Sequence, residues 1–129
     1  MNNLKQKFCI VADGGGVRGV FTCGFIEQLE KFIIEKGYGD KITDVFDSFV
    51  GTSTGSMIAS LLASGKYSGD DLCNKIATNQ NMARIFSKRQ NVLKNRLLLN
   101  PKYFNNPLID LCHEYLGDIK MFDLPNSLM

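Results

Sequence analysis

The sequence is poor in features that define several common protein classes. It contains no tryptophan, one histidine and four cysteines, and none of the cysteines forms a C-x-x-C pair. A zinc finger is therefore excluded, and reduced cysteines in a cytosolic protein are a better interpretation than disulfides. The net charge is only +2, which gives no reason to expect nucleic acid as a partner.

Long apolar runs are also missing. The apolar run at residues 8–12 is too short for the core of a signal peptide, and glycines follow it directly. No segment approaches the roughly 20 apolar residues that a membrane-spanning helix needs. We therefore expect a cytoplasmic protein that reaches lipid from the water side, as a peripheral protein at a membrane surface.

The remaining composition is that of an ordinary globular chain. The 129 residues are 44% hydrophobic and 22% charged, which argues against disorder and for one domain at most. Apolar runs at 8–12 and 46–50 are typical of buried strands. Helical patterns follow each run, at about 17–36 and at 56–64. This alternation predicts an α/β fold with a βαβ-based parallel sheet.

The first predicted helix has apolar residues at three- and four-residue steps. Glu27 and Lys31 lie on its polar side with the spacing of a favourable ion pair. The apolar positions are Val17, Val20, Phe21, Phe25, Leu29, Phe32 and Ile33.

The second half of the sequence has weaker patterns. A helix is expected to start at residues 69–71, with Leu72, Ile76 and Met82 on its buried side. Pro107 opens another helix through Leu116, and residues 121–124 begin a further strand. Two strands cannot hide their own sheet edges, so we expect a continuation beyond residue 129 or a homo-oligomer that covers the edge.

The strongest motif is Gly51-x-Ser53-x-Gly55, placed between a strand and a helix. A nucleophilic serine must project from a sharp strand-to-helix turn that leaves no room for side chains two positions away, and glycines satisfy this need. The amino end of the following helix favours a nearby oxyanion. The alternative is a structural turn in which Ser53 caps the helix; we favour the nucleophile.

A glycine loop at residues 13–19 follows the first strand and admits two interpretations. Gly14-x-Gly16-x-x-Gly19 matches the dinucleotide-binding fingerprint, with Asp40 near the position of a ribose-binding acid. However, no strand is expected to end at Asp40, and no Gly-Lys-Ser/Thr follows for a phosphate-binding P-loop. In the other interpretation, backbone amides of the loop face the serine on the next strand as an oxyanion hole. Only this second interpretation explains both motifs together.

Two weaker candidates are set aside. His113 and Asp110 are three residues apart on one predicted helix, so a catalytic triad with Ser53 is disfavoured and a surface histidine is expected. A cluster of basic residues is more typical of a solvated helix face than of a membrane contact. Its members are Arg84, Lys88, Arg89, Lys94 and Arg96, and the nearby Phe86, Tyr103 and Phe104 are expected to be packing residues.

The motifs D-G-G-G-x-R-G at 13–19 and F-D-x-x-x-G-T-S-T-G at 46–55 resemble those of the patatin-like phospholipases, including the calcium-independent phospholipase A2 branch. The resemblance extends from about residue 7 to residue 124. It implies a fold related to α/β hydrolases, with residues 1–129 as the N-terminal portion of a patatin-like catalytic domain. It also implies hydrolysis of lipid acyl esters through an acyl-serine intermediate and a Ser-Asp dyad.

Residue roles carry over by position in these motifs. Ser53 is the implied nucleophile, while Gly14, Gly15 and Gly16 supply oxyanion donors and Arg18 occupies the basic position beside the loop. The family's catalytic aspartate lies in a later D-G-G or D-G-A motif. In this chain the only aspartate followed by glycine is Asp13, in the loop itself, so the general base is absent from the chain.

Two hypotheses follow, and a dinucleotide-binding domain remains as a remote third. The first is a serine lipid acyl hydrolase whose dyad aspartate lies outside this chain, with a lipid or phospholipid as substrate. The alternative is a non-catalytic patatin-like binding or interaction module. No calcium-binding loop pattern is present, so we expect no metal and no other cofactor.

Overall fold

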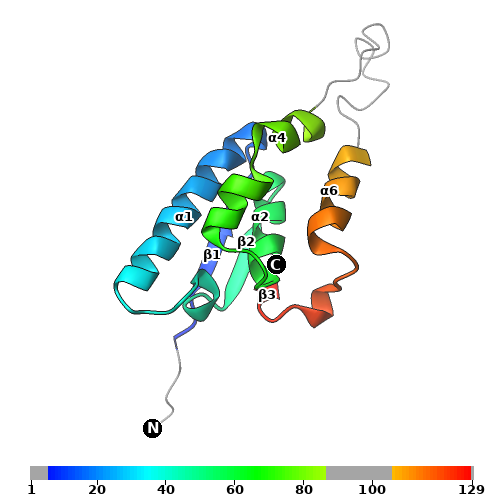
Figure 1. Cartoon of the computed structure of the whole chain (residues 1–129). Coiled ribbons are helices and arrows are strands. Elements are labelled where there is room, and N and C mark those ends of the chain that lie inside the picture. The colour runs from blue at the N-terminus through cyan, green and yellow to red at the C-terminus, as the bar shows by residue number, and fades with distance from the viewer. Residues whose placement is uncertain (1–5, 87–105, 129) are drawn as a thin grey trace, which may run out of the picture.

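The computed structural model describes residues 6–86 and 106–128 (Figure 1). Four members of the basic cluster and two aromatic residues of the sequence analysis lie outside the described residues. They are Lys88, Arg89, Lys94, Arg96, Tyr103 and Phe104.

A parallel sheet organises the chain, which confirms the predicted α/β class. The strands are β1 (Cys9–Ala12), β2 (Ser48–Gly51) and β3 (Ser127–Leu128), and their spatial order is β1-β2-β3. The prediction of a strand at 121–124 was wrong: Met121–Asp123 form a 3₁₀ turn, η4, and the strand follows Pro125. Phe122 is 97% exposed, so its apolar character did not indicate burial.

Helices connect the strands (Figure 1). The crossover between β1 and β2 contains α1 (Gly19–Glu35), and α2 (Thr54–Ala63) follows β2 directly. The remaining elements are the 3₁₀ turns η1 (Gly16–Arg18) and η2 (Ile42–Asp44), α3 (Gly69–Asp71), the π-helical turn η3 (Leu72–Ile76), α4 (Asn79–Ile85) and α6 (Asn106–Leu116). No helix within the described ranges combines the length and apolar character needed to cross a bilayer.

The segment that was expected to form one helix from residue 69 is divided. The wider π turn η3 ends where the Ala77 amide donates to the Leu72 carbonyl, and Thr78 then caps a new helix by accepting from the Asn81 amide. The predicted burial of Leu72, Ile76 and Met82 is confirmed.

The buried face of α1 matches the predicted one only in part, since Ile33 is buried and Leu29 packs against the core. Phe21 and Phe25 are 81% and 68% exposed, although the predicted Glu27–Lys31 ion pair is present. The residues that α1 buries are Gly19, Cys23, Ile26, Glu30 and Ile33. The helix thus carries apolar residues on two opposite sides, and spacing alone cannot tell which side meets the neighbouring elements. A helix with apolar residues on two opposite sides is typically packed against other parts of a protein on both of those sides.

The sheet is covered on one face within the described residues. Phe49 and Ala12 are buried in the core, whereas Val11 is 69% exposed and Cys9 is also exposed. Successive side chains of a strand point to opposite faces, so Cys9 and Val11 mark the open one. Parallel sheets are normally covered on both faces, which makes this open face an unusual feature.

The four cysteines are free, as expected. Burial raises the pKa of Cys23 to about 12, and burial together with the hydrogen bond to Glu27 raises that of Cys73 to about 11. Both thiols therefore stay protonated at neutral pH and are poor nucleophiles.

A buried carboxylate joins three segments. Glu30, on α1, is only 6% exposed. Its side-chain oxygens accept hydrogen bonds from the amide of Ile42, at the start of η2 (3.1 Å), and from the amide of Gly69, at the start of α3 (2.6 Å). Each amide belongs to the first turn of a helix, where it has no partner within that helix. Glu30 thus anchors both helix starts to α1.

Replacing Glu30 with alanine should leave these two buried amides without acceptors. We expect Glu30→Ala to lower the free energy of unfolding by about 3 kcal/mol, measured by urea denaturation. Glu30→Gln keeps one acceptor and should lose less. The matched control is Glu35→Ala, since the Glu35 side chain is 74% exposed and its removal should change stability by less than about 0.5 kcal/mol. Equal losses in Glu30→Ala and Glu35→Ala would contradict the anchoring role.

Candidate active site

The glycine loop and the serine turn lie side by side at one edge of the sheet. β1 and β2 are adjacent and parallel, so the loop after Ala12 and the turn after Gly51 emerge at the same end. The loop reaches the serine: a Cβ placed on Gly14 would lie 2.6 Å from the Cβ of Ser53. The two motifs, far apart in the sequence, form one site.

Ser53 has an unusual backbone conformation. Its φ is 52° and its ψ is −125°, and it is the only non-glycine residue with positive φ in the described part of the chain. Such a conformation costs about 1–3 kcal/mol and tends to occur at functional sites. Ser53 is exposed, and its side chain makes no capping hydrogen bond to α2. The capping role that was the alternative for this serine is therefore not observed.

The two glycines that flank Ser53 occupy positions where a side chain does not fit. A Cβ on Gly51 would lie 2.2 Å from the carbonyl oxygen of Gly55, and a Cβ on Gly55 would lie 2.0 Å from that of Ala12. Real Cβ atoms do not come so close to backbone atoms. Glycine at both positions lets α2 begin directly against the end of β1.

Two threonines tie the loop to the turn. The Gly14 amide donates to Thr52 Oγ1 (3.0 Å), and Thr54 Oγ1 donates to the Gly16 carbonyl (3.0 Å). These threonines immediately precede and follow Ser53. Sequence reasoning gave them no role; their symmetric placement, with a hydroxyl on each side of the serine, was the available signal.

The backbone amides of the loop differ in their hydrogen bonding. The Gly14 amide is engaged by Thr52, whereas no described group accepts from the amides of Gly15 or Gly16. Gly16 has a φ of 60°, which favours glycine. The exposed Arg18 lies in η1, and its amide donates to the Gly15 carbonyl (3.2 Å), which closes the turn after the loop. Within the described residues, the amides of Gly15 and Gly16 thus have no side-chain or loop acceptor, unlike that of Gly14.

Other candidates from the sequence lie elsewhere. Asp110 and His113 are exposed on α6, and neither joins the loop and the turn. Asp40 lies in a bend with no strand before it, as expected. Arg84 hydrogen-bonds Asn81 and Glu114 on the protein surface. Among the described residues, no group of histidine, cysteine, aspartate and glutamate side chains is arranged to hold a metal ion.

The sequence is similar to known proteins over most of its length. The family model for patatin-like phospholipases matches residues 10–123. A cGAMP-activated phospholipase of Vibrio cholerae is 32% identical over 94% of this chain and 36% of its own length. Patatin-like protein 2 of Oryza sativa subsp. indica is 31% identical over 92% of this chain and 32% of its own length. The chain therefore spans about a third of the length of these relatives.

The close approach at Gly55 generates a test with a matched control. Gly55→Ala should lower the free energy of unfolding by about 3 kcal/mol, because the new methyl group meets the backbone of β1. Gly24→Ala on α1 meets nothing within 4 Å and should raise stability by about 0.5–1 kcal/mol through helix propensity. Thermal or urea unfolding measures both. A tolerated Gly55→Ala would contradict the tight turn.

The hydrogen bond from Thr54 generates a second test. Thr54→Val keeps the shape of the side chain but removes the donor to the Gly16 carbonyl, so we expect a loss of about 1 kcal/mol in unfolding free energy. Thr54→Ser keeps the hydroxyl and should retain the bond. Amide resonances of residues 14–16 in an NMR spectrum should shift in the valine variant and much less in the serine variant. The reverse order would show that the methyl group, rather than the hydroxyl, holds the loop.

Proposed function

The chain belongs to the patatin-like phospholipase family, and on that premise we propose that it forms the N-terminal part of a serine lipid acyl hydrolase. The observation that carries the proposal is the conformation of Ser53: an exposed hydroxyl on a strained turn, with the glycine loop against it. A strained, non-capping serine at a helix start is the geometry that nucleophilic catalysis needs.

In the proposed reaction, Ser53 Oγ attacks the carbonyl carbon of a lipid acyl ester. Its proton passes to a general base, and the carbonyl oxygen becomes an oxyanion. The free amides of Gly15 and Gly16 donate to this oxyanion, aided by the amino end of α2. The intermediate then expels the alcohol portion of the lipid, which takes up the proton, and water hydrolyses the acyl-serine.

The role of Gly14 differs from that of its two neighbours in this scheme. Its amide already donates to Thr52, so Gly14 serves mainly by giving Ser53 room. Arg18 closes the loop through its amide, and its exposed guanidinium adds positive charge near the developing oxyanion.

The base belongs to a part of the protein beyond these 129 residues. We propose an aspartate there, since no aspartate of this chain other than Asp13 precedes a glycine. The open sheet face and the outer side of α1 support a larger domain, because both present apolar side chains that further chain would cover. A second copy of this chain is the alternative cover. A non-catalytic interaction module is the alternative function, favoured only by the missing aspartate.

The substrate we propose is a lipid or phospholipid presented at a membrane surface, reached from the cytoplasm. The exposed position of Ser53 supports this proposal, because a hydroxyl at the protein surface can reach an ester group at a membrane surface. The small net charge gives no support for a nucleic-acid partner.

The test compares the 129-residue chain with the product of the whole natural reading frame that contains it, using a short-chain chromogenic ester. We expect turnover by the longer protein, its loss in Ser53→Ala by a factor of about 10³ or more, and none from the short chain. The control Ser60→Ala, further along α2, should leave turnover unchanged.

A reaction of Ser53 that does not need the general base distinguishes the hydrolase from the non-catalytic interaction module. An alkyl fluorophosphonate should label Ser53 in the short chain, and intact mass with peptide mapping locates the adduct. Turnover that survives Ser53→Ala would overturn the assignment of the nucleophile. A folded longer protein that neither turns over esters nor reacts with the probe would favour the interaction module.

A further inference from the structure

An aromatic ring from a distant part of the chain packs against the glycine loop. Phe86 follows the last residue of α4, and its ring atoms Cε1 and Cζ lie 3.6 and 3.7 Å from the position of a Cβ built on Gly16. A methyl group at this position would meet the ring at van der Waals distance, so the ring lies directly beside the Cα of Gly16. The ring is half-buried, and it lies beside the residue whose amide we assign to the oxyanion.

The helix that carries this ring is held by apolar packing. Met82 and Ile85 of α4 and Leu111 of α6 form a small buried cluster against which Phe86 packs. Met57 of α2 also joins this cluster, so α4 is fixed both to α6 and to the helix that follows Ser53. This buried cluster therefore supports the Phe86 ring.

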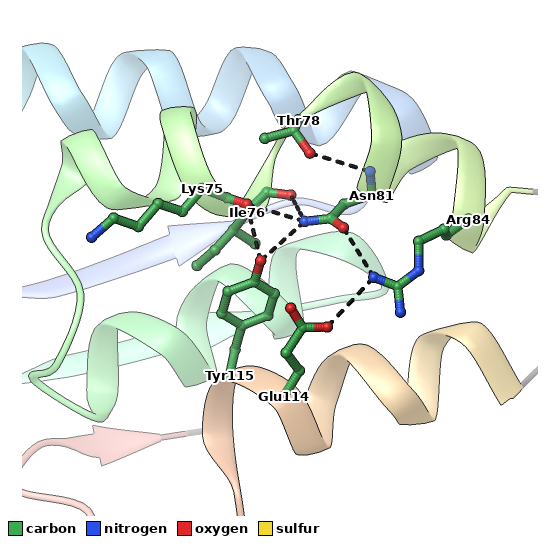
Figure 2. Close-up of polar contacts among 7 residues, drawn as sticks. All are labelled: Lys75, Ile76, Thr78, Asn81, Arg84, Glu114 and Tyr115. Atoms are coloured by element: carbon green, nitrogen blue, oxygen red, sulfur yellow. Dashed lines mark hydrogen bonds and ion pairs between the residues drawn. The ribbon is translucent and has the colours of Figure 1, made fainter.

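A polar network fixes the other end of the same helix (Figure 2). Asn81, only 6% exposed, donates to the carbonyls of Lys75 (3.0 Å) and Ile76 (3.2 Å) and to Tyr115 Oη (3.2 Å). Tyr115 Oη in turn donates to the Lys75 carbonyl (3.1 Å). These carbonyls end the π turn, where helical partners run out, so Asn81 and Tyr115 together satisfy them.

The same network reaches the surface. Arg84 donates to Asn81 Oδ1 (3.3 Å) and pairs with Glu114 of α6 (3.4 Å). Figure 2 shows Asn81 at the centre, with Tyr115 and Glu114 rising from α6 toward it. Asn81, Arg84, Glu114 and Tyr115 thus clamp α4 between the π turn and α6.

We propose that Phe86 is a positioning residue for the glycine loop. The network of Asn81, Arg84, Glu114 and Tyr115 fixes α4, and α4 in turn fixes the position of the Phe86 ring. Three consecutive glycines have more backbone freedom than any other residues and carry no side chain for anchoring. The two threonines hold the loop from the serine side, and the ring of Phe86 bears on Gly16. The proposal rests on the proposed function only in the use it gives to the Gly15 and Gly16 amides.

The contact itself has a spectroscopic signature. A ring at this distance shifts the Hα resonances of Gly16, so both Phe86→Leu and Phe86→Ala should move them toward ordinary glycine values. Exchange of the Gly14 amide, which depends on the bond to Thr52, should accelerate by about tenfold in Phe86→Ala. Phe86→Leu refills much of the space and should restore slow exchange.

Ile33→Ala is the matched control, because Ile33 is a buried isoleucine of the main core (3% exposed) that lies outside the cluster around Phe86. It should reduce global stability and leave the Gly16 Hα resonances in place. Unshifted Gly16 resonances in Phe86→Ala, or equal Gly14 exchange in Phe86→Ala and Ile33→Ala, would overturn the proposal.

A second measurement connects the position of the loop to chemistry. The rate at which an alkyl fluorophosphonate labels Ser53 should fall by about tenfold or more in Phe86→Ala, because misplaced oxyanion donors stabilise the adduct less. It should recover in Phe86→Leu, whereas Ile33→Ala should label at the original rate. Absence of labelling in the unaltered chain would count against the proposed function and leave the NMR result to decide the role of Phe86. Unchanged labelling in Phe86→Ala, with labelling in the unaltered chain, would refute the positioning role.

Discussion

The contact between the start of α2 and the end of β1 is the constraint on which the site depends. Gly55 lies so close to the Ala12 carbonyl that only a hydrogen atom fits between them. This approach brings Thr52 and Thr54 within hydrogen-bonding distance of the glycine loop. Ser53, between the two threonines, is left with positive φ and an exposed hydroxyl. The absence of a side chain at Gly55 thus allows the loop, the turn and the serine to lie where they do.

Buried polar side chains also fix the positions of segments that lie further from the serine. Glu30 accepts from the first amides of two short helices, and Asn81 donates to the last carbonyls of the π turn. Both side chains are almost fully buried, and both serve backbone groups that helical geometry leaves without partners. Short helices and irregular turns make up much of this chain, so such side chains hold together segments that regular hydrogen bonding alone would not.

Local motifs made part of the structure predictable. Glycines at fixed spacing, between an apolar run and a helical pattern, identified both the loop and the serine turn, because these features depend only on neighbouring residues. The buried side of α1 could not be predicted in this way, since Phe21 and Phe25 on one side compete with Cys23 and Ile26 on the other. The three apolar residues in 121–124 predict a strand there, yet Phe122 is almost fully exposed. The placement of the Phe86 ring beside Gly16 brings distant segments together and has no signal in the spacing of the sequence.

The backbone of Ser53 also has an evolutionary consequence. Glycine at this position would relieve a penalty of about 1–3 kcal/mol, a sizeable part of the stability of a small domain. A more stable sequence thus lies one substitution away, and natural proteins commonly leave such substitutions unused because they are rarely at their stability optimum. The exposed hydroxyl of Ser53 is therefore present at a local cost in stability.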